Sequence, residues 1–146
     1  MYKIVAVGTD GSPTADKAVE AAAGLARSIG AQLHIITAYK AAGSGFAAAT
    51  AGAPMVDSGA EYALRSEAAN EVAQRAVDKW GTGMKVEIHT MAGDAANVIL
   101  DTAEAIGADL IVVGSKGMRG ARRYLGSVPN SVAHAAPCAV LVVKTD

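Results

Sequence analysis

The chain has 146 residues, of which 51% are hydrophobic and 18% charged, and its formal net charge is −1. This size and composition predict one globular domain, residues 1–146, with a sizeable hydrophobic core. The near-neutral charge argues against a nucleic-acid partner, and because no apolar run is long enough to span a bilayer, we expect no membrane contact. One cysteine, Cys138, excludes an internal disulfide, and with no recognisable signal peptide it favours a cytoplasmic location.

The first forty residues alternate apolar runs with one amphipathic stretch. Residues 3–8 form a run without polar alternation, as expected of a strand that is buried on both faces. Ser12 is a predicted helix N-cap and Pro13 the first helical residue, and apolar residues then recur at helical spacing until Gly30. A second strand is predicted over residues 33–39.

The middle of the chain continues this alternation after a segment of small residues. Residues 41–57, rich in Ala, Gly, Ser and Thr, predict a flexible loop. A helix is predicted over 58–80. Polar and apolar residues alternate over 85–91, which indicates an edge strand with one wet face. A third helix begins after Gly93-Asp94.

The last third contains two more strands, predicted over 110–113 and 139–143, with a short helix over 129–135 between them. The pattern β-α-β-α-β-α-β-α-β predicts an α/β fold, a doubly wound, Rossmann-like parallel sheet with helices on both faces. Polar, glycine-bearing loops follow the first and fourth strands. If these strands are neighbours at the switch point, the strand order is 3-2-1-4-5. The order 2-1-3-4-5 would instead place residues 90–93 at the crevice, and these carry less chemistry.

The segment after the fourth strand has the composition of an anion-binding loop. Its glycines let backbone N–H groups approach a ligand, and Ser127 is a predicted N-cap for the following helix. Four cations lie within one stretch of eight residues, 116–123. A basic, glycine-rich loop between a buried strand and a helix favours phosphate as the anion. The glycines are Gly114, Gly117, Gly120 and Gly126, and the cations are Lys116, Arg119, Arg122 and Arg123.

This segment resembles the nucleotide-binding segment of the universal stress protein family, in which Gly-x-x-Gly is followed by nine residues and then Gly-Ser or Gly-Thr. Here eight residues separate Gly114-x-x-Gly117 from Gly126-Ser127. The resemblance covers nearly the whole chain, from the segment Val7-Gly8-Thr9-Asp10-Gly11-Ser12 to the closing strand. The combination of motifs carries the specificity, since Gly-x-x-Gly alone is a weak signal.

The resemblance to the ATP-binding branch of this family implies an adenine nucleotide, ATP, ADP, AMP or cyclic AMP, with or without Mg²⁺. It also implies a homodimer that pairs through strand 139–143. In that branch the first loop contacts adenosine, the end of the second strand lines the adenine pocket, and the glycine loop holds ribose and phosphates. In this sequence the first loop corresponds to Thr9, Asp10 and Gly11, and the end of the second strand to Ala38. The residues that correspond to the glycine loop and helix start are Val113, Gly114, Gly117, Gly126, Ser127 and Val128, with Arg119 as a further predicted contact.

The favoured function is therefore a nucleotide-binding sensor or regulator in the stress response, with no catalytic residue predicted. Two alternatives stay open: a slow ATP hydrolase, in which Asp10 is the evident candidate for orienting water, and a nucleotide-free dimeric interaction protein. Asp10 is equally well explained as a turn residue. Lys116 is either a phosphate clamp or a solvent-facing lysine, and the loop glycines are either a cradle or simple turn formers.

The three histidines, His34, His89 and His134, fall on different predicted elements. Because their spacing matches no metal-ligand motif, no metal site is predicted.

Overall fold

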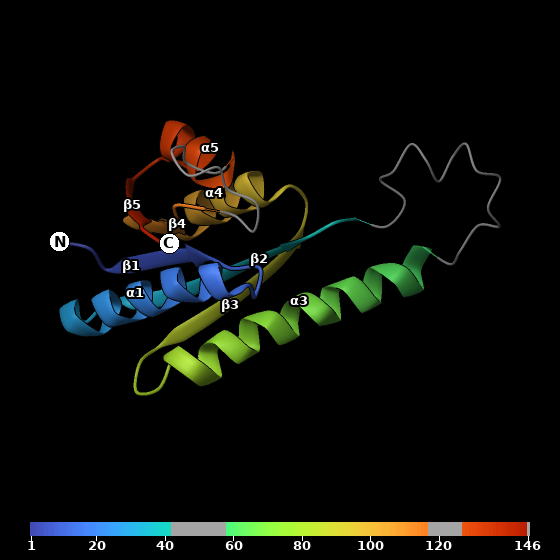
Figure 1. Cartoon of the computed structure of the whole chain (residues 1–146), viewed down its shortest axis with the longest axis horizontal. Helices are drawn as coiled ribbons and strands as arrows, with labels where there is room; N and C mark the ends of the chain where they lie inside the picture. The colour runs from blue at the N-terminus through green and yellow to red at the C-terminus, as the bar shows by residue number, and fades with distance from the viewer. Residues whose placement is uncertain (42–57, 117–126, 146) are drawn as a thin grey trace.

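The computed structural model describes residues 1–41, 58–116 and 127–145 of the chain, which form a five-stranded, wholly parallel sheet with helices on both faces (Figure 1). The strand order is β3-β2-β1-β4-β5, which confirms the predicted α/β fold and the order 3-2-1-4-5. In chain order, the elements are β1 (Ile4–Gly8), α1 (Pro13–Ile29), β2 (Gln32–Tyr39), α3 (Ser58–Trp80), β3 (Val86–Ala92), α4 (Ala95–Ile106), β4 (Leu110–Gly114), α5 (Ser127–Ala135) and β5 (Ala139–Val143).

Two hydrophobic clusters, one on each side of the sheet, hold these layers together. Alternate residues of a strand point to opposite faces, so Val5 and Val7 of β1 face α1 and α3, while Ala6 between them faces α4 and α5. Ile36 of β2 and Val132 of α5 belong to the second cluster. In Figure 1, α1 and α3 accordingly lie below the sheet, and α4 and α5 above it.

Helix ends lie where the capping residues predict them, with one exception. The Ser12 hydroxyl accepts a hydrogen bond from Ala15 N–H (3.2 Å), and Gly30 adopts a left-handed conformation (φ 71°) that ends α1. The predicted N-cap at Ser127 is wrong, because α5 begins at that residue and not at Pro129. Pro129 is tolerated in the first turn of α5 because the N–H groups of a first turn have no acceptor within their own helix.

Two segments with sequence predictions fall outside the described residues. Of the predicted flexible loop 41–57, only Ala41 is described. Of the glycine segment, residues 117–126 lie outside the described residues. Gly117, Arg119 and Gly126 therefore have no structural account here. Among the described residues, no helix is both long and apolar enough to cross a lipid bilayer.

The two edges of the sheet are β3 and β5. The predicted position of β3 at an edge is confirmed, and its residues are exposed or half-buried throughout. On β5, Ala139 and Leu141 are exposed although the strand is wholly apolar. An apolar edge strand of this kind offers backbone groups and side chains to a further strand.

The register of β2 and β3 brings two histidines together, although they lie on different elements as predicted. His34 pairs with Glu87 and Ile36 with His89, which places all four side chains on one face. His34 Nδ1 lies 2.8 Å from His89 Nε2, and the rings stack with 5.1 Å between centroids. Burial of the ring, and then the neighbouring His89, lowers the pKa of His34.

Candidate functional site

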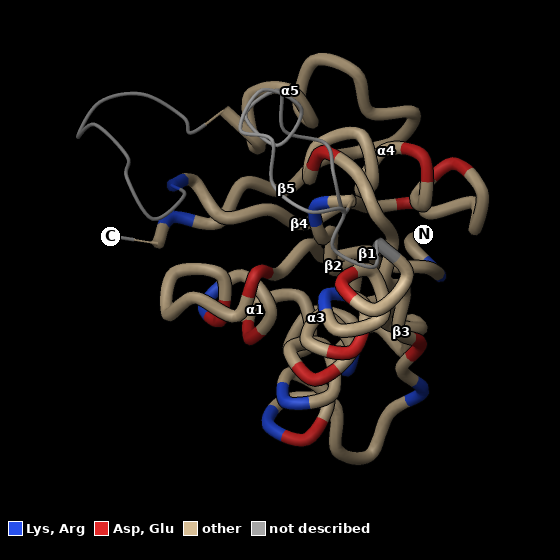
Figure 2. The backbone as a smooth tube through the Cα atoms, turned by 90° about the vertical axis from the view of Figure 1, so that its right-hand side faces the viewer, with Lys and Arg blue, Asp and Glu red and all other residues tan. Residues whose placement is uncertain are grey.

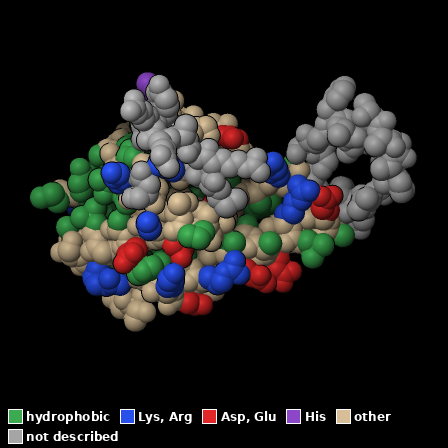
Figure 3. Space-filling view, in the orientation of Figure 1, with side chains coloured by type: hydrophobic (Ala, Val, Ile, Leu, Met, Phe, Trp, Pro, Cys, Tyr) green, Lys and Arg blue, Asp and Glu red, His purple; other side chains and the backbone are tan. Residues whose placement is uncertain are grey.

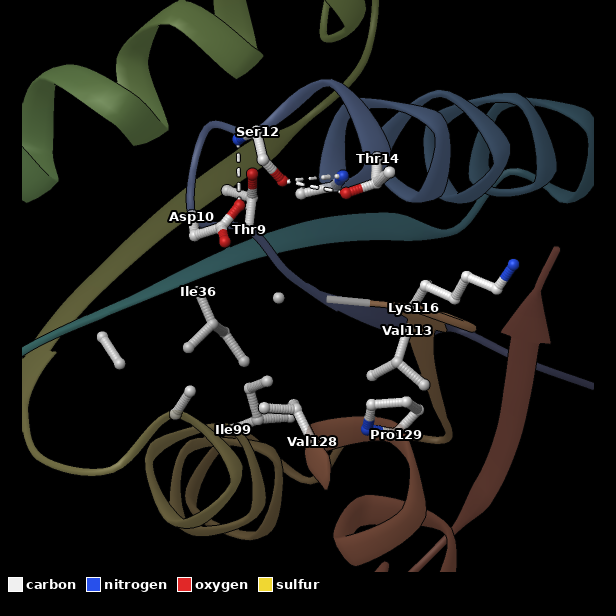
Figure 4. A pocket seen from close by; sticks show the side chains of 15 residues that line it. Thr9, Asp10, Ser12, Thr14, Ile36, Ile99, Val113, Lys116, Val128 and Pro129 are labelled. Atoms are coloured by element: carbon white, nitrogen blue, oxygen red, sulfur yellow. Dashed lines mark hydrogen bonds between the residues drawn. The ribbon is translucent and has the colours of Figure 1, made fainter. Parts of the chain in front are cut away.

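A cleft opens at the carboxyl ends of β1 and β4, the two neighbouring strands at which the winding of the sheet reverses (Figure 4). Gly8 and Thr9 line it after β1, and Val113 and Gly114 line it at the end of β4. This is the place where doubly wound sheets bind ligands. Its empty volume, which includes space open to solvent, is about 670 Å³.

The amino-terminal ends of three helices meet at this cleft. Thr14 and Ala15 line it from the first turn of α1, Ala95 from the start of α4, and Val128 and Pro129 from the start of α5. Each helix follows a parallel strand, so the sheet topology itself gathers these helix ends. The N-terminal end of a helix carries partial positive charge and unpaired N–H groups, and the cleft therefore favours an anion.

The loop after β1 is fixed by hydrogen bonds between neighbouring residues. Thr9 N–H donates to the Ile36 carbonyl of β2 (2.9 Å), and the Thr9 hydroxyl accepts from Gly11 N–H (3.1 Å). Asp10 Oδ1 accepts from Ser12 N–H (2.9 Å; Figure 4), which is an Asx-turn. One carboxylate oxygen of Asp10 therefore serves the turn, while its side chain also belongs to the lining of the cleft.

The lining is apolar on one side and polar on the other. Ile36 and Ile99 point into the space between the sheet and α4 in Figure 4. Ala38, two residues beyond Ile36 on β2 and therefore on the same face, also lines the cleft. Thr14 and Lys116 lie on the polar side, toward α1 and the end of β4. Such a cleft suits a ligand with a flat apolar ring at one end and a negative group at the other.

Both strands that lead into the cleft end in glycine because neighbouring atoms approach closely. A Cβ atom on Gly8 would lie 2.5 Å from Ile99 Cδ1, and one on Gly114 would lie 3.0 Å from Thr145 Cγ2. Thr145 is itself held in place, since its carbonyl accepts from Lys17 Nζ (3.0 Å) and its N–H donates to the Ser115 hydroxyl (3.2 Å). Larger side chains at either glycine would displace these neighbours.

The structure brings six of the predicted site residues into the lining of this one cleft. Gly11 lies outside the lining, where a positive φ (79°) and the closeness of Val72 to a would-be Cβ (3.1 Å) account for the glycine. Ser127 is exposed at the start of α5 and is also not part of the lining. The six are Thr9, Asp10, Ala38, Val113, Gly114 and Val128.

Sequence reasoning missed part of the lining. Ile36 could have been found, because it precedes Ala38 by two residues and therefore shares its face of β2. Ile99 and Ala95 could not, since their positions depend on how α4 packs against the sheet. The further missed residues are Gly8, Ser12, Thr14, Ala15 and Pro129.

Charged residues of both signs are interspersed along α1 and α3 (Figure 2), and the face of the molecule in Figure 3 shows side chains of both signs among one another. Lys79 of α3 is paired with Asp16 of α1 (2.8 Å), and Arg75 lies 4.0 Å from Glu71 on the same helix. On this side of the described structure, no extended area of one sign is present that would attract a nucleic acid by charge alone.

Comparison with known proteins agrees with this geometry. The sequence model of the universal stress protein family matches residues 1–144. A universal stress protein of Methanocaldococcus jannaschii is 37% identical over an alignment 156 positions long, which covers 99% of this chain and 83% of that protein. A solved universal stress protein in complex with cAMP is 32% identical, with a TM-score of 0.65 and coverage of 99% and 98%. UspA from Lactobacillus plantarum, 22% identical with coverage of 98% of each chain, shares the fold with a TM-score of 0.80. The chain therefore belongs to the universal stress protein family.

Proposed function

We propose that this protein binds an adenine nucleotide in the cleft between β1 and β4 and acts as a sensor or regulator in the stress response. The observation that carries the proposal is the meeting of three helix N-termini beside an apolar wall formed by Ile36, Ala38 and Ile99. The helix ends favour phosphate, and the apolar wall favours a base. The cAMP complex of a relative that is 32% identical supports this ligand class.

The proposed orientation places the base against the apolar wall and the phosphates toward Thr14 and Lys116. The family resemblance implies Gly117, Arg119 and Gly126 as further contacts to ribose and phosphates. Pro129 has no N–H to donate, so among the lining residues of α5 a backbone contact to phosphate falls to Val128, while the contact from Ser127 rests on the family resemblance. Where the nucleotide carries Mg²⁺, Asp10 is the carboxylate in the described lining that can share the ion.

The first test is mass spectrometry of small molecules released when freshly purified protein is denatured. The second is calorimetric titration with ATP, AMP and cyclic AMP. We expect binding of at least one of them, and we expect Ala38→Phe, which fills the base end of the cleft, to abolish it. Ala63→Phe, on the exposed surface of α3, is the matched control. Wild-type protein that binds none of these nucleotides while unfolding cooperatively would contradict the proposal.

We also propose a homodimer that pairs through β5 and a cytoplasmic location. The apolar edge strand, with Leu141 39% exposed, supports the dimer because pairing with a twofold-related copy would cover it. The single Cys138 supports a reducing compartment.

A further inference from the structure

We propose that His34, Glu87 and His89 form a site for a divalent transition-metal ion of the zinc class at the β2–β3 edge of the sheet. One ligand atom from each of these side chains lies within 4.8 Å of the other two. The proposal is independent of the nucleotide cleft, because none of the three residues belongs to the lining of the cleft.

The parallel register explains why these ligands converge. His34 pairs directly with Glu87, and His89 lies two residues beyond Glu87 on the same face of β3. The nitrogen atoms His34 Nδ1 and His89 Nε2 are 2.8 Å apart, and Glu87 Oε2 is 3.9 Å from His34 Nδ1. Zinc–nitrogen bonds of about 2.0–2.1 Å in a tetrahedral site separate two ligand atoms by roughly 3.4 Å. Small side-chain movements therefore bring all three atoms to ligating distance.

A neighbouring residue already orients the carboxylate. Gln32 Nε2 donates to Glu87 Oε1 (2.7 Å), which leaves Oε2 on the side of His34. Metal ligands are commonly positioned by such outer hydrogen bonds. Lys85 Nζ, 3.6 Å from Glu87 Oε1, is the nearby charge that opposes a cation, and it is 72% exposed and free to swing outward.

The donor set determines the class of ion. Two imidazole nitrogens and one carboxylate oxygen suit Zn²⁺, Co²⁺, Ni²⁺ and Cu²⁺, whereas Mg²⁺ and Ca²⁺ favour ligand sets made of oxygen. Three protein ligands leave a fourth position for water, and the 46% exposed Glu87 side chain lies on the accessible side of the site. The site is therefore of the open type.

Burial restricts how His34 can take part in the site. Its side chain is 95% buried on a sheet face whose neighbouring residues Ala6 and Ile111 are apolar, and its Nε2 atom has no hydrogen-bond partner among the described residues. Burying a polar ring with one unmet nitrogen costs free energy, which packing alone does not explain. The proposed metal bond is at Nδ1, on the other side of the ring, so it would hold the imidazole in place without giving Nε2 a partner.

The test is a Co²⁺ titration of the full-length, untagged protein in buffer without nucleotide or phosphate, followed by visible d–d absorption, with Zn²⁺ added as competitor. We expect one ion per chain, and displacement by Zn²⁺. Loss of a residue that only hydrogen-bonds to a metal ligand typically weakens metal binding by roughly 10- to 100-fold, and we expect about 10-fold for Gln32→Ala. His89→Gln and Glu87→Gln remove a ligand itself and should weaken binding by more than that. His134→Gln, on the exposed surface of α5, is the matched control and should bind as the wild type.

Unchanged binding in His89→Gln and Glu87→Gln, or loss of binding in His134→Gln, would overturn the proposal. Absence of Co²⁺ and Zn²⁺ binding by cooperatively folded wild-type protein would also overturn it, and would leave His34 and His89 as a hydrogen-bonded pair. Imidazole ¹⁵N spectra give a second measurement. Zinc should shift His34 Nδ1 and His89 Nε2 and leave both nitrogens of His134 unchanged.

Discussion

Gly8, the last residue of β1, lies so close to Ile99 of α4 that a Cβ atom on it would sit 2.5 Å from Ile99 Cδ1. Ile99 also lines the apolar side of the cleft. The close approach of strand and helix therefore sets the position of a cleft residue, and a change at Gly8 should affect stability and ligand binding together.

The first prediction concerns Gly8→Ala. The new methyl group displaces the flexible end of Ile99, so we expect a loss of about 1–3 kcal/mol in the free energy of unfolding. We also expect weaker nucleotide binding, because the displaced Ile99 side chain narrows the cleft. Urea unfolding and calorimetry measure the two effects. Gly24→Ala is the matched control, since a Cβ atom on Gly24 would meet no neighbouring atom within 4 Å. This substitution should stabilise α1 by about 0.5–1 kcal/mol.

The second prediction is a pH dependence of stability that arises from Asp109. Its Oδ2 accepts hydrogen bonds from Lys3 N–H (2.7 Å) and Ile4 N–H (2.9 Å), and these bonds lower the pKa of Asp109. A group whose pKa is lower in the folded state stabilises the fold above its ordinary value, here 3.8. This contribution is lost as pH falls through the lowered pKa. Asp109→Asn should therefore be less stable than wild type near neutral pH.

Urea unfolding of both proteins over a pH series checks this sign. The difference between them should shrink as pH falls below 3.8 and Asp109 in the wild type becomes protonated. A difference that grew toward acid pH would contradict the assignment.

The strand order was predictable because polar residues gather where ligands bind. The loops that begin after Gly8 and after Gly114 follow the first and fourth strands, and placing these strands side by side was enough to select the order that the structure has. The ends of α1 were equally predictable, since Ser12 and Gly30 act through local backbone geometry.

Contacts between distant elements were not predictable. The pairing of His34 with Glu87 joins two residues that are more than fifty positions apart in the sequence and depends on the register of β2 and β3. A shift of one residue in this register would leave the two side chains on opposite faces of the sheet. Gly11 lies in a segment with the composition of a binding loop, but it is not part of the cleft lining, and a Cβ atom on it would meet Val72 of α3. Motif spacing carries no information about such packing.

The third prediction tests the proposed dimer. Leu141→Lys places a charge on the exposed part of β5 and should convert the dimer to monomer, because a buried, unpaired charge at the strand interface is costly. Leu64→Lys, at a 67% exposed position of α3, introduces the same change away from β5 and should leave the dimer intact. Sedimentation equilibrium measures the association. A wild-type protein that is monomeric throughout the concentration series would contradict the proposal.

The fourth prediction separates phosphate contacts from base contacts. Lys116 lines the polar side of the cleft, so Lys116→Gln should weaken ATP binding by roughly tenfold or more and AMP binding by less. The difference should shrink as salt concentration rises. Lys144→Gln makes the same change in net charge at an exposed position beyond β5, and it should alter neither affinity. Equal losses for ATP and AMP would show that Lys116 does not face the terminal phosphates.

The fifth prediction decides between the two roles of Asp10. Asn can still accept the hydrogen bond from Ser12 N–H through its side-chain oxygen, whereas Ala cannot. We therefore expect Asp10→Asn to keep wild-type stability within about 0.5 kcal/mol, and Asp10→Ala to lose about 1 kcal/mol.

If the charge of Asp10 also holds Mg²⁺, both variants should lose the stimulation of ATP binding by Mg²⁺. Calorimetry with and without Mg²⁺ measures this, and release of phosphate at a rate that falls in both variants would establish slow hydrolysis. Unchanged Mg²⁺ dependence in Asp10→Asn would leave Asp10 as a turn residue alone, since that variant keeps the turn and removes only the charge.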